Sequence, residues 1–242
     1  MVNNMLWFEK CDSTMDICHR FSSICDRELI IGSSIQIEGR GTKNRGWVSP
    51  SGNLYLSYLL YPKHRKIHTI HMIGTLSVLK FLEQKFGDHN ISIKWPNDVM
   101  VDEKKICGVL QENVFKNSQL IYSVLGIGLN VNMQINSEID VPHNSVQLIT
   151  NKTEDIKNLA KDITCIFNEY YMSGISDVEI MNIWRNNIDT IGKKIKLILL
   201  DEEFISGKVK DIDLNGDLVL NLSNNKLITI KAGMVKEMKI SK

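Results

Sequence analysis

The stretch KWPNDVMVDEKKICGVLQEN, residues 94–113, is the most informative part of this chain. It opens with KWPND at 94–98, and Lys105 and Gly108 follow closely. Because a proline forces the residue before it into an extended conformation, Pro96 predicts a strand that ends abruptly here. A lysine, an amide and a carboxylate then lie together at a strand end, which is a common location for functional sites.

Each residue of this stretch also has an ordinary interpretation. A single lysine is usually a surface charge, Trp95 would normally belong to the core, and Asp98 could simply cap a turn. The concentration of polar groups favours a site instead. If residues 105–112 form a regularly alternating strand, Lys105 and Cys107 point to one face and Gly108 leaves space opposite.

A basic glycine loop, EGRGTKNRGW at 38–47, lies upstream. Its glycines let main-chain N–H groups approach an anion, and Arg40, Lys43 and Arg45 can neutralise a phosphate. The loop matches neither GxxxxGK[ST] nor GxGxxG. Taken alone, such a segment is as often a solvated turn as a binding site. We expect it to be mobile without ligand.

Two further segments have features typical of a binding site. The segment LGIGLNVN at 125–132 places two glycines inside a strand, which implies close approach of a ligand or of another part of the protein. Asn130 offers a donor and an acceptor that suit an adenine edge, although a turn asparagine is equally consistent. Ser13 and Thr14 could cap a helix, or bind a small polar ligand at its N-terminus.

Hydrophobic periodicity predicts an α+β unit followed by a small all-β barrel of about fifty residues. The expected strands of the first unit are 6–8, 29–37, 53–61, 91–95, 105–112 and 119–131, and its expected helices are 14–24, 67–85, 156–170 and 178–184. Short strands at 194–200, 203–210, 217–222 and 226–230, with 235–238 as a candidate fifth, predict the barrel. We place the two domains at 1–188 and 189–242.

Composition excludes several classes of protein. The 242 residues carry 29 Lys+Arg and 28 Asp+Glu, a formal net charge of +1, without the basic excess of a nucleic-acid binder. The five cysteines form no CxxC pair, so neither a zinc site nor a disulfide framework is expected. No signal peptide or apolar run of membrane length is present, and we expect a cytoplasmic protein without a membrane partner.

Taken in order, these segments resemble the biotin–protein ligase family over residues 6–240. The motifs that carry the resemblance are Asp12-Ser13-Thr14, Gln36-x-x-Gly39-Arg40-Gly41, Trp47-x-Ser49-Pro50, Asn53-Leu54-Tyr55-Leu56-Ser57, Lys94–Asp98, Lys105-Ile106-x-Gly108 and Gly126–Asn132. The resemblance implies a class II aminoacyl-tRNA-synthetase-like catalytic domain with a mixed β-sheet and flanking helices. It also implies that the terminal barrel is Src-homology-3-like.

The resemblance further implies a two-step reaction. Biotin and ATP would give biotinyl-5′-AMP and pyrophosphate, with magnesium, and the adenylate would then acylate one lysine of a biotin carboxyl carrier domain. The implied biotin site is Ser13, Thr14, Gln36, Gly39, Arg40 and Gly108. The implied ATP and adenylate site is Arg40, Arg45, Trp47, Asn97, Lys105 and Asn130. The implied reaction centre is Lys105, Arg40, Asp98 and Lys94.

Three positions depart from the family pattern. Thr42 stands where a basic residue is common, Met15 stands where asparagine is common after Ser-Thr, and the Ser49–Asn53 turn is one residue shorter. These departures bear on substrate geometry rather than on the reaction. Because few residues precede Ser13, we expect the form without an N-terminal DNA-binding domain, and no DNA partner.

Two alternatives and several questions stay open. The first alternative is a lipoate– or octanoate–protein ligase on a related fold, and the second is a non-catalytic module that binds the carrier domain. The sequence specifies neither the carboxylase that would supply the carrier domain nor the residues that would hold magnesium. A homodimer is left open.

Overall fold

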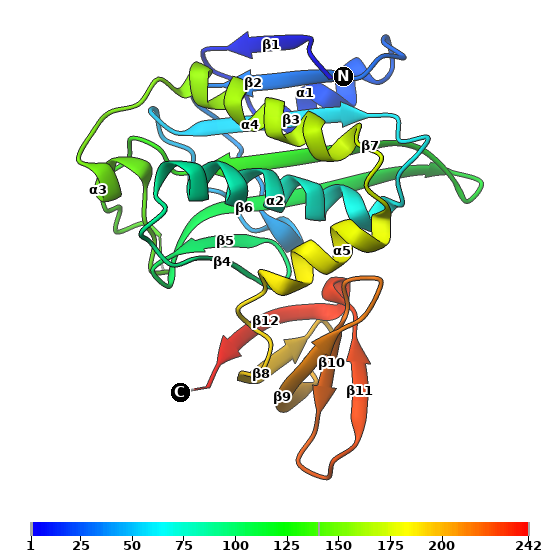
Figure 1. Cartoon of the computed structure of the whole chain (residues 1–242). Helices are drawn as coiled ribbons and strands as arrows, with labels where there is room; N and C mark the ends of the chain where they lie inside the picture. Colours follow the sequence, from blue (N-terminus) through cyan, green and yellow to red (C-terminus); the bar gives the residue numbers. More distant parts are fainter. Residues whose placement is uncertain (1, 140, 242) are drawn as a thin grey trace.

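Seven strands form the central sheet, in the order β1-β2-β3-β7-β6-β5-β4 (Figure 1). A computed structural model describes residues 2–139 and 141–241. The strands are β1 Met5–Phe8, β2 Leu29–Ser33, β3 Leu54–Leu60, β4 Ile91–Lys94, β5 Asp98–Val101, β6 Lys104–Lys116 and β7 Gln119–Leu129. β1 pairs with β2 in parallel and every other neighbouring pair is antiparallel, so the sheet is mixed, as expected.

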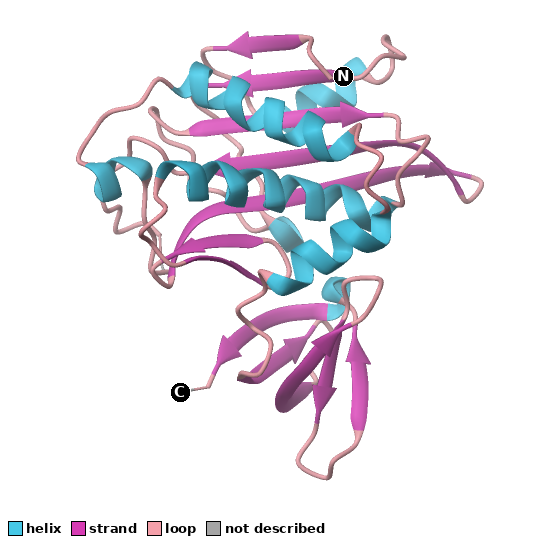
Figure 2. Cartoon of the chain, viewed as in Figure 1, coloured by secondary structure: helices cyan, strands magenta, loops and turns pink. Residues whose placement is uncertain are grey.

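One face of the sheet is covered by long helices (Figure 2). α2 (Ile67–Lys85) and α4 (Ile156–Tyr171) lie across it, and α5 (Asp177–Asn186) follows. Every residue of β3 is buried, because the strand lies inside the sheet and is covered on both faces. This strand and α2 contribute to the main hydrophobic core.

The other face is only partly covered. The short helix α1 (Thr14–Phe21) packs there, and a second apolar cluster forms around Met15, Ile17 and Cys18. Alternation along β3 separates the two cores, since Leu59 packs with α1 and Leu60 with the main core. The part of this face beyond α1 carries the candidate site.

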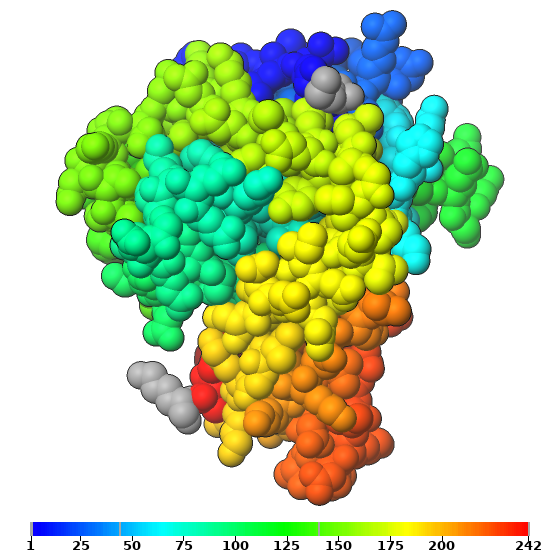
Figure 3. Space-filling view, viewed as in Figure 1, coloured from blue at the N-terminus to red at the C-terminus, as the bar shows by residue number. Residues whose placement is uncertain are grey.

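A five-stranded antiparallel sheet forms the C-terminal barrel, which is a distinct lobe in the space-filling view (Figure 3). Its strands are β8 Lys194–Leu199, β9 Phe204–Ile212, β10 Leu218–Asn221, β11 Leu227–Ile230 and β12 Val235–Ile240. The fifth strand is therefore confirmed. Glu202, Gly216 and Asn225 adopt positive φ angles in the turns between these strands. The proposed boundary at 188/189 lies in the segment before β8.

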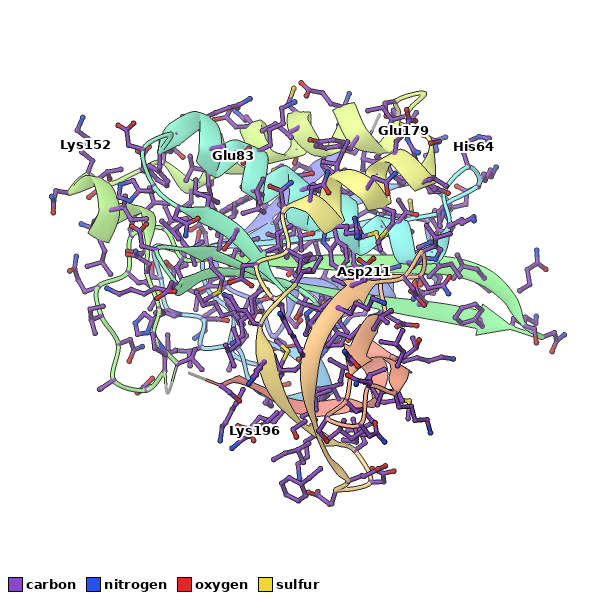
Figure 4. The ribbon with its side chains drawn as sticks, turned by 60° about the horizontal axis from the view of Figure 1, so that its bottom comes forward. His64, Glu83, Lys152, Glu179, Lys196 and Asp211 are labelled. Atoms are coloured by element: carbon purple, nitrogen blue, oxygen red, sulfur yellow. The ribbon has the colours of Figure 1, made fainter. Side chains whose placement is uncertain are left out.

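Contacts from several elements fasten the barrel to the larger unit. Arg185 of α5 donates a 2.5 Å hydrogen bond from Nε to Asp211 of β9. Figure 4 labels Asp211 where the barrel approaches the helices. Ile188, just after α5, forms a parallel bridge with Ile93, so the connecting segment extends the edge of the large sheet at β4.

Two short elements were not predicted from the sequence. The chain does not leave the sheet after KWPND but turns back as β5, and Asp102 and Glu103 then make a positive-φ turn into β6. Hydrophobic alternation over four residues is too brief to distinguish such a strand from a loop. The second is α3 (Val146–Thr150), whose N-cap Ser145 accepts a hydrogen bond from the main-chain N–H of Leu148.

Element ends differ by a few residues elsewhere. α1 ends at Phe21 rather than near residue 24, and β2 ends at Ser33 rather than near 37. Among the described residues, no helix combines the length and apolarity that crossing a membrane requires.

Candidate functional site

Two glycines on neighbouring strands create the floor of the site. Gly108 of β6 pairs directly with Gly128 of β7. A Cβ atom would lie 2.8 Å from the Trp47 ring at Gly108 and 2.7 Å from it at Gly128. Trp47 therefore lies against a surface that only glycines permit, and the expected close approach is made by this indole. Its buried Nε1 has no hydrogen-bond partner among the described residues.

Lys105 extends over the same ring. Its ammonium nitrogen lies 4.9 Å from the centre of the Trp47 ring, within the range of a cation–π interaction, and 2.7 Å from Oδ1 of Asp98. The two charged side chains are only partly accessible to solvent. The strand pairing and the turn bring together the lysine and the carboxylate that the sequence had singled out.

The expected direction of Lys105 was wrong. Val99 pairs with Cys107 and Met100 with Lys105, so Ile106 is an extra residue in β6. This β-bulge interrupts the alternation. Lys105 consequently shares a face with Gly108, whose Cβ would lie 3.5 Å from the lysine Cε, whereas Cys107 packs in the main core.

The remaining polar residues of KWPND are placed by the β4–β5 hairpin. Lys94 pairs in register with Asp98 and is half-buried. Asn97 donates from Nδ2 to the main-chain oxygen of Val109 at 2.7 Å, and its own carbonyl accepts from the Val109 N–H at 2.9 Å. Asn97 thus fastens the turn to β6. The nucleotide-binding role expected for Asn97 stays a prediction.

A second polar group lies at the N-terminus of α1. Gln36 Oε1 accepts from the main-chain N–H of Thr14 at 2.8 Å and from its hydroxyl at 3.0 Å. The Thr14 hydroxyl is also 2.7 Å from Ser57 Oγ, and Gln36 Nε2 donates to Ser49 Oγ. Ser13 is the buried N-cap residue, yet its side chain makes no capping hydrogen bond. Ser13 therefore stands at the predicted helix start, but the capping hydrogen bond expected from its side chain is absent among the described residues.

Glycine and methionine shape the space beside this polar group. A Cβ at Gly39 would collide with the Ser49 hydroxyl and the Trp47 carbonyl, so the loop can pass here only with glycine. The Met15 sulfur lies 2.7 Å from where a Cβ of Gly126 would be. Met15, which departs from the family pattern, thus packs directly over Gly126 of β7.

Arg40 does not lie beside Lys105. Its guanidinium donates from Nε and Nη2 to the two carboxylate oxygens of Glu112, at 3.3 and 3.2 Å, and from Nη1 to Asp16. Glu112 is four residues beyond Gly108 on β6, so both cations face the same side of the sheet. Arg40 has two carboxylate partners and Lys105 has one, and these ion pairs are separate from each other.

Two other expected ligand residues are engaged elsewhere. Arg45 is exposed and donates to the main-chain oxygen and the hydroxyl of Thr42, within its own loop. Asn130 is buried and donates from Nδ2 to the main-chain oxygen of Asn144 at 3.0 Å. Neither contacts the Lys105 group, so their nucleotide roles stay predictions.

Comparison with known proteins identifies the family. Residues 7–130 match the biotin/lipoate A/B protein ligase family, and residues 190–235 match the biotin protein ligase C-terminal domain. The chain belongs to the biotin/lipoate A/B protein ligase family. It shares the fold of the biotin protein ligases, so the expected fold class and resemblance are confirmed.

Individual members of the family resemble this chain over different shares of its length. The bifunctional ligase/repressor BirA of Bacillus subtilis is 26% identical over 91% of this chain and 70% of its own length. The biotin–[acetyl-CoA-carboxylase] ligase of Paracoccus denitrificans is 30% identical over 40% of this chain and 41% of its own. The biotin protein ligase of Aquifex aeolicus, solved with biotin and ATP, superposes with a TM-score of 0.79 and 28% identity, covering 99% of this chain and 100% of that one.

Three polar residues belong to the site although the sequence analysis did not assign them to it. Asp16 and Glu112 hold Arg40, and His19 Nε2 lies 2.7 Å from Oε2 of Glu112. Asp16 was expected only to favour the first turn of α1. The spacing from Gly108 to Glu112 was the available signal, because residues four apart on a strand share a face.

Metal-binding groups and cavities also bear on where a ligand could be held. Among the described residues there is no group of three or more His, Cys, Asp or Glu side chains that could hold a metal ion. Cavities of about 360 and 270 Å³ share Arg65 and Tyr171 in their walls. The Arg65 side chain is only 6% exposed and donates to the main-chain oxygens of Tyr170, Tyr171, Ser173 and Ile175, so it fastens the end of α4.

Proposed function

We propose that this chain is an ATP-dependent biotin–protein ligase. It activates biotin as biotinyl-5′-AMP and transfers the biotinyl group to a lysine of a biotin carboxyl carrier domain. The observation that carries the proposal is the Lys105–Asp98 pair beside Trp47 on the Gly108–Gly128 surface. It lies in a fold that relatives named biotin ligases share along the chain.

The first step joins two anions. A carboxylate oxygen of biotin attacks the α-phosphorus of ATP, a new C–O–P linkage forms, and the bond to pyrophosphate breaks. A fixed positive charge beside the attacking oxygen and the α-phosphate lowers the repulsion between them. Lys105 supplies this charge from a defined position, because Asp98 and Trp47 hold its ammonium group. Alignment of the two substrates contributes the rest.

The second step needs a neutral amine. A free lysine side chain has a pKa of about 10.4, so the acceptor lysine arrives protonated at neutral pH. Asp98 is the carboxylate at the reaction centre that can orient this amine and accept its proton. The amine nitrogen then attacks the biotinyl carbonyl, the bond to AMP breaks and an amide forms. Lys94, in register with Asp98, adds positive charge on the same hairpin.

The polar cluster at α1 suits the uncharged head of biotin. Thr14, Gln36, Ser49 and Ser57 present hydroxyl and amide groups that can exchange their mutual hydrogen bonds for those of a ureido ring. Ser13 precedes Thr14 at the start of α1, and Gly39 packs against Ser49 and Gln36, so both lie beside this cluster. Gly108, under Trp47, is the remaining residue proposed for the biotin site.

Nucleotide binding rests on residues around the loop. Trp47 offers an aromatic surface, and Arg45, Asn97 and Asn130 are the expected polar contacts. Magnesium would enter with the nucleotide, because substrate phosphates commonly hold this ion, and no step here depends on protein ligands to it. The acceptor is proposed as a carrier domain of a biotin-dependent carboxylase, in a cytoplasmic setting.

A second candidate is a lipoate– or octanoate–protein ligase, since the matched family includes lipoate enzymes. Basic groups beside the glycine loop could bind the carboxylate of biotin or that of lipoate. The match of the C-terminal domain to biotin protein ligases favours biotin. Thermal-shift measurements with biotin and with lipoate separate the two, because only a ligand that binds the folded state raises the melting temperature.

The deciding experiment is incubation with biotin, MgATP and a carrier domain, followed by intact mass of the carrier. We expect the mass of one biotinyl group to be added. Lys105→Ala should abolish adenylate formation, measured by biotin-dependent pyrophosphate exchange. Lys104→Ala is the matched control, because Lys104 is its exposed neighbour. Normal exchange in Lys105→Ala would exclude the role given to that lysine.

A further inference from the structure

The guanidinium of Arg40 is occupied on every nitrogen. Nε and Nη2 donate to both oxygens of Glu112, and Nη1 donates to Asp16. Side-on pairing of this kind fixes the plane of the guanidinium as well as its position. The three side chains come from the loop, from the first turn of α1 and from β6, so Arg40 fastens the loop to two separate elements.

The charge of Arg40 is also neutralised within this group. The hydrogen bond from His19, and then that from Arg40, keep the pKa of Glu112 below its usual value, so Glu112 is ionised at neutral pH. Two carboxylates therefore surround one guanidinium before any ligand is present. An anionic substrate would have to compete with both of them for Arg40, whereas Lys105 has the single partner Asp98.

The loop transmits the position of Arg40 to Trp47. Arg40 forms a β-bridge with Gly46, and the Trp47 N–H donates to the Gly39 carbonyl at 2.8 Å. The Gly41 N–H donates to the Arg45 carbonyl at 2.7 Å. The loop is thus a small hairpin with Arg40 on one arm and the entry to Trp47 on the other.

We propose that Arg40 is a positioning residue. Asp16 and Glu112 hold its guanidinium, and the loop hairpin thereby keeps Trp47 over Gly108 and Gly128. In this position the loop retains the adenylate. Lys105, not Arg40, supplies the positive charge for adenylate formation. The identity of the retained intermediate rests on the proposed ligase function. The anchoring of the loop does not depend on that function.

The anchoring is tested first, on the protein without substrates. Trypsin cleavage after Lys43 or Arg45 reports opening of the loop, and mass spectrometry identifies the cut. We expect Glu112→Gln and Asp16→Asn to be cut at these sites at least about tenfold faster than the parent protein. Arg20→Gln is the control, since Arg20 is an exposed arginine of α1 that pairs with Asp12. An unchanged cleavage rate in both variants overturns the proposal, whether or not the chain is a ligase.

The second measurement follows the adenylate. At saturating biotin and ATP, both carboxylate variants should form adenylate within about twofold of the parent rate but release it into solution about tenfold faster, with a raised KM for biotin. Arg40→Gln should behave in the same way, and Arg40→Gln combined with Glu112→Gln should be no worse than either alone.

A direct ligand contact by Arg40 gives a different pattern. Arg40→Gln would then reduce the rate of adenylate formation by about a hundredfold, Glu112→Gln would not, and Arg40→Lys would recover part of the rate. That pattern overturns the positioning role. If the parent protein forms no adenylate while the trypsin result holds, the ligase proposal fails and the anchoring stands.

Discussion

The indole Nε1 of Trp95 donates a 2.8 Å hydrogen bond to the main-chain oxygen of Gly216. This contact joins the KWPND segment of the site to the β9–β10 turn of the barrel. Trp95 is buried, and its main-chain N–H donates to Thr190 Oγ1 in the connecting segment. Lys94 and Asn97 therefore lie on a hairpin whose position the barrel helps to set.

Trp95→Phe should weaken both stability and activity. The change leaves the buried Gly216 carbonyl without its donor, which costs about 1–2 kcal/mol of the free energy of unfolding. Urea unfolding measures this cost. Because the hairpin loosens, the rate of carrier biotinylation should also fall, by about tenfold.

Trp184→Phe is the matched control for that variant. The buried Trp184 also packs near Gly216, but its indole donates to Thr75 Oγ1 of α2 at 2.9 Å rather than to the barrel turn. It should lose similar stability and keep its activity at temperatures where it is folded. Equal losses of activity in the two variants would show that the barrel contact has no special part in the site.

Gly128→Ala should displace Trp47. The new methyl group would lie 2.7 Å from the indole, closer than carbon atoms approach without movement. We expect the affinity for biotin to fall by about tenfold or more, while the free energy of unfolding changes by less than about 1 kcal/mol, since the loop can lift away. Titration calorimetry measures the affinity. Gly233→Ala is the control, because no atom lies within 4 Å of the Cβ it would add; equal affinities would disprove the packing argument.

Lys105→Met and Asp98→Asn should affect different steps. Without the ammonium group, adenylate formation should fall by about a hundredfold or more. Without the carboxylate, adenylate should still form, but its transfer to the carrier should slow by about a hundredfold. Pyrophosphate release measures the first step and carrier mass the second. Identical profiles would mean that the pair acts as one unit in both steps.

Stability should fall in acid because of His71. Burial lowers the pKa of this residue of α2 to about 4, from its usual value of 6.5, and its ring packs edge-on against Trp184. Between these values the unfolded chain binds a proton that the folded chain does not. The free energy of unfolding should therefore fall as pH decreases from about 6.5 to 4, by about 2 kcal/mol for a ring that keeps some accessible surface.

His71→Gln removes this titration and serves as the control. Urea unfolding at several pH values should show a shallower dependence in the variant. Burial also lowers the pKa of His68, so part of the slope should persist. A variant with the same slope as the parent protein would show that His71 is not responsible.

Much of the site could be found from the sequence because its residues lie at strand and helix ends with strong local signals. Pro96 restricts the backbone, whereas the glycines of the loop and of β7 permit unusual conformations and close approach. These effects are local, so they can be recognised without knowledge of distant contacts. The same reasoning located Lys105 and Asp98, which the structure places 2.7 Å apart. It also identified α2 over its full length, Ile67–Lys85.

The errors arose where a contact between distant segments decides the outcome. Alternation placed Lys105 with Cys107, but a bulge in the pairing of β5 with β6 turned the lysine to the face of Gly108. Arg40 was expected beside Lys105, but Asp16 and Glu112 hold it elsewhere on the same face. Neither the direction of Lys105 nor the partners of Arg40 can be predicted from residues that are neighbours in sequence.

The sequence by itself carried the motifs that resemble the family, and its hydrophobic period predicted the two-part fold. It also identified the polar groups, because these stand beside prolines and glycines whose effects on the backbone are local. Only the tertiary structure decided which carboxylate holds which cation. The physical reason is that an ion pair depends on the distance between charges, and strand register and bulges set that distance across segments far apart in the chain.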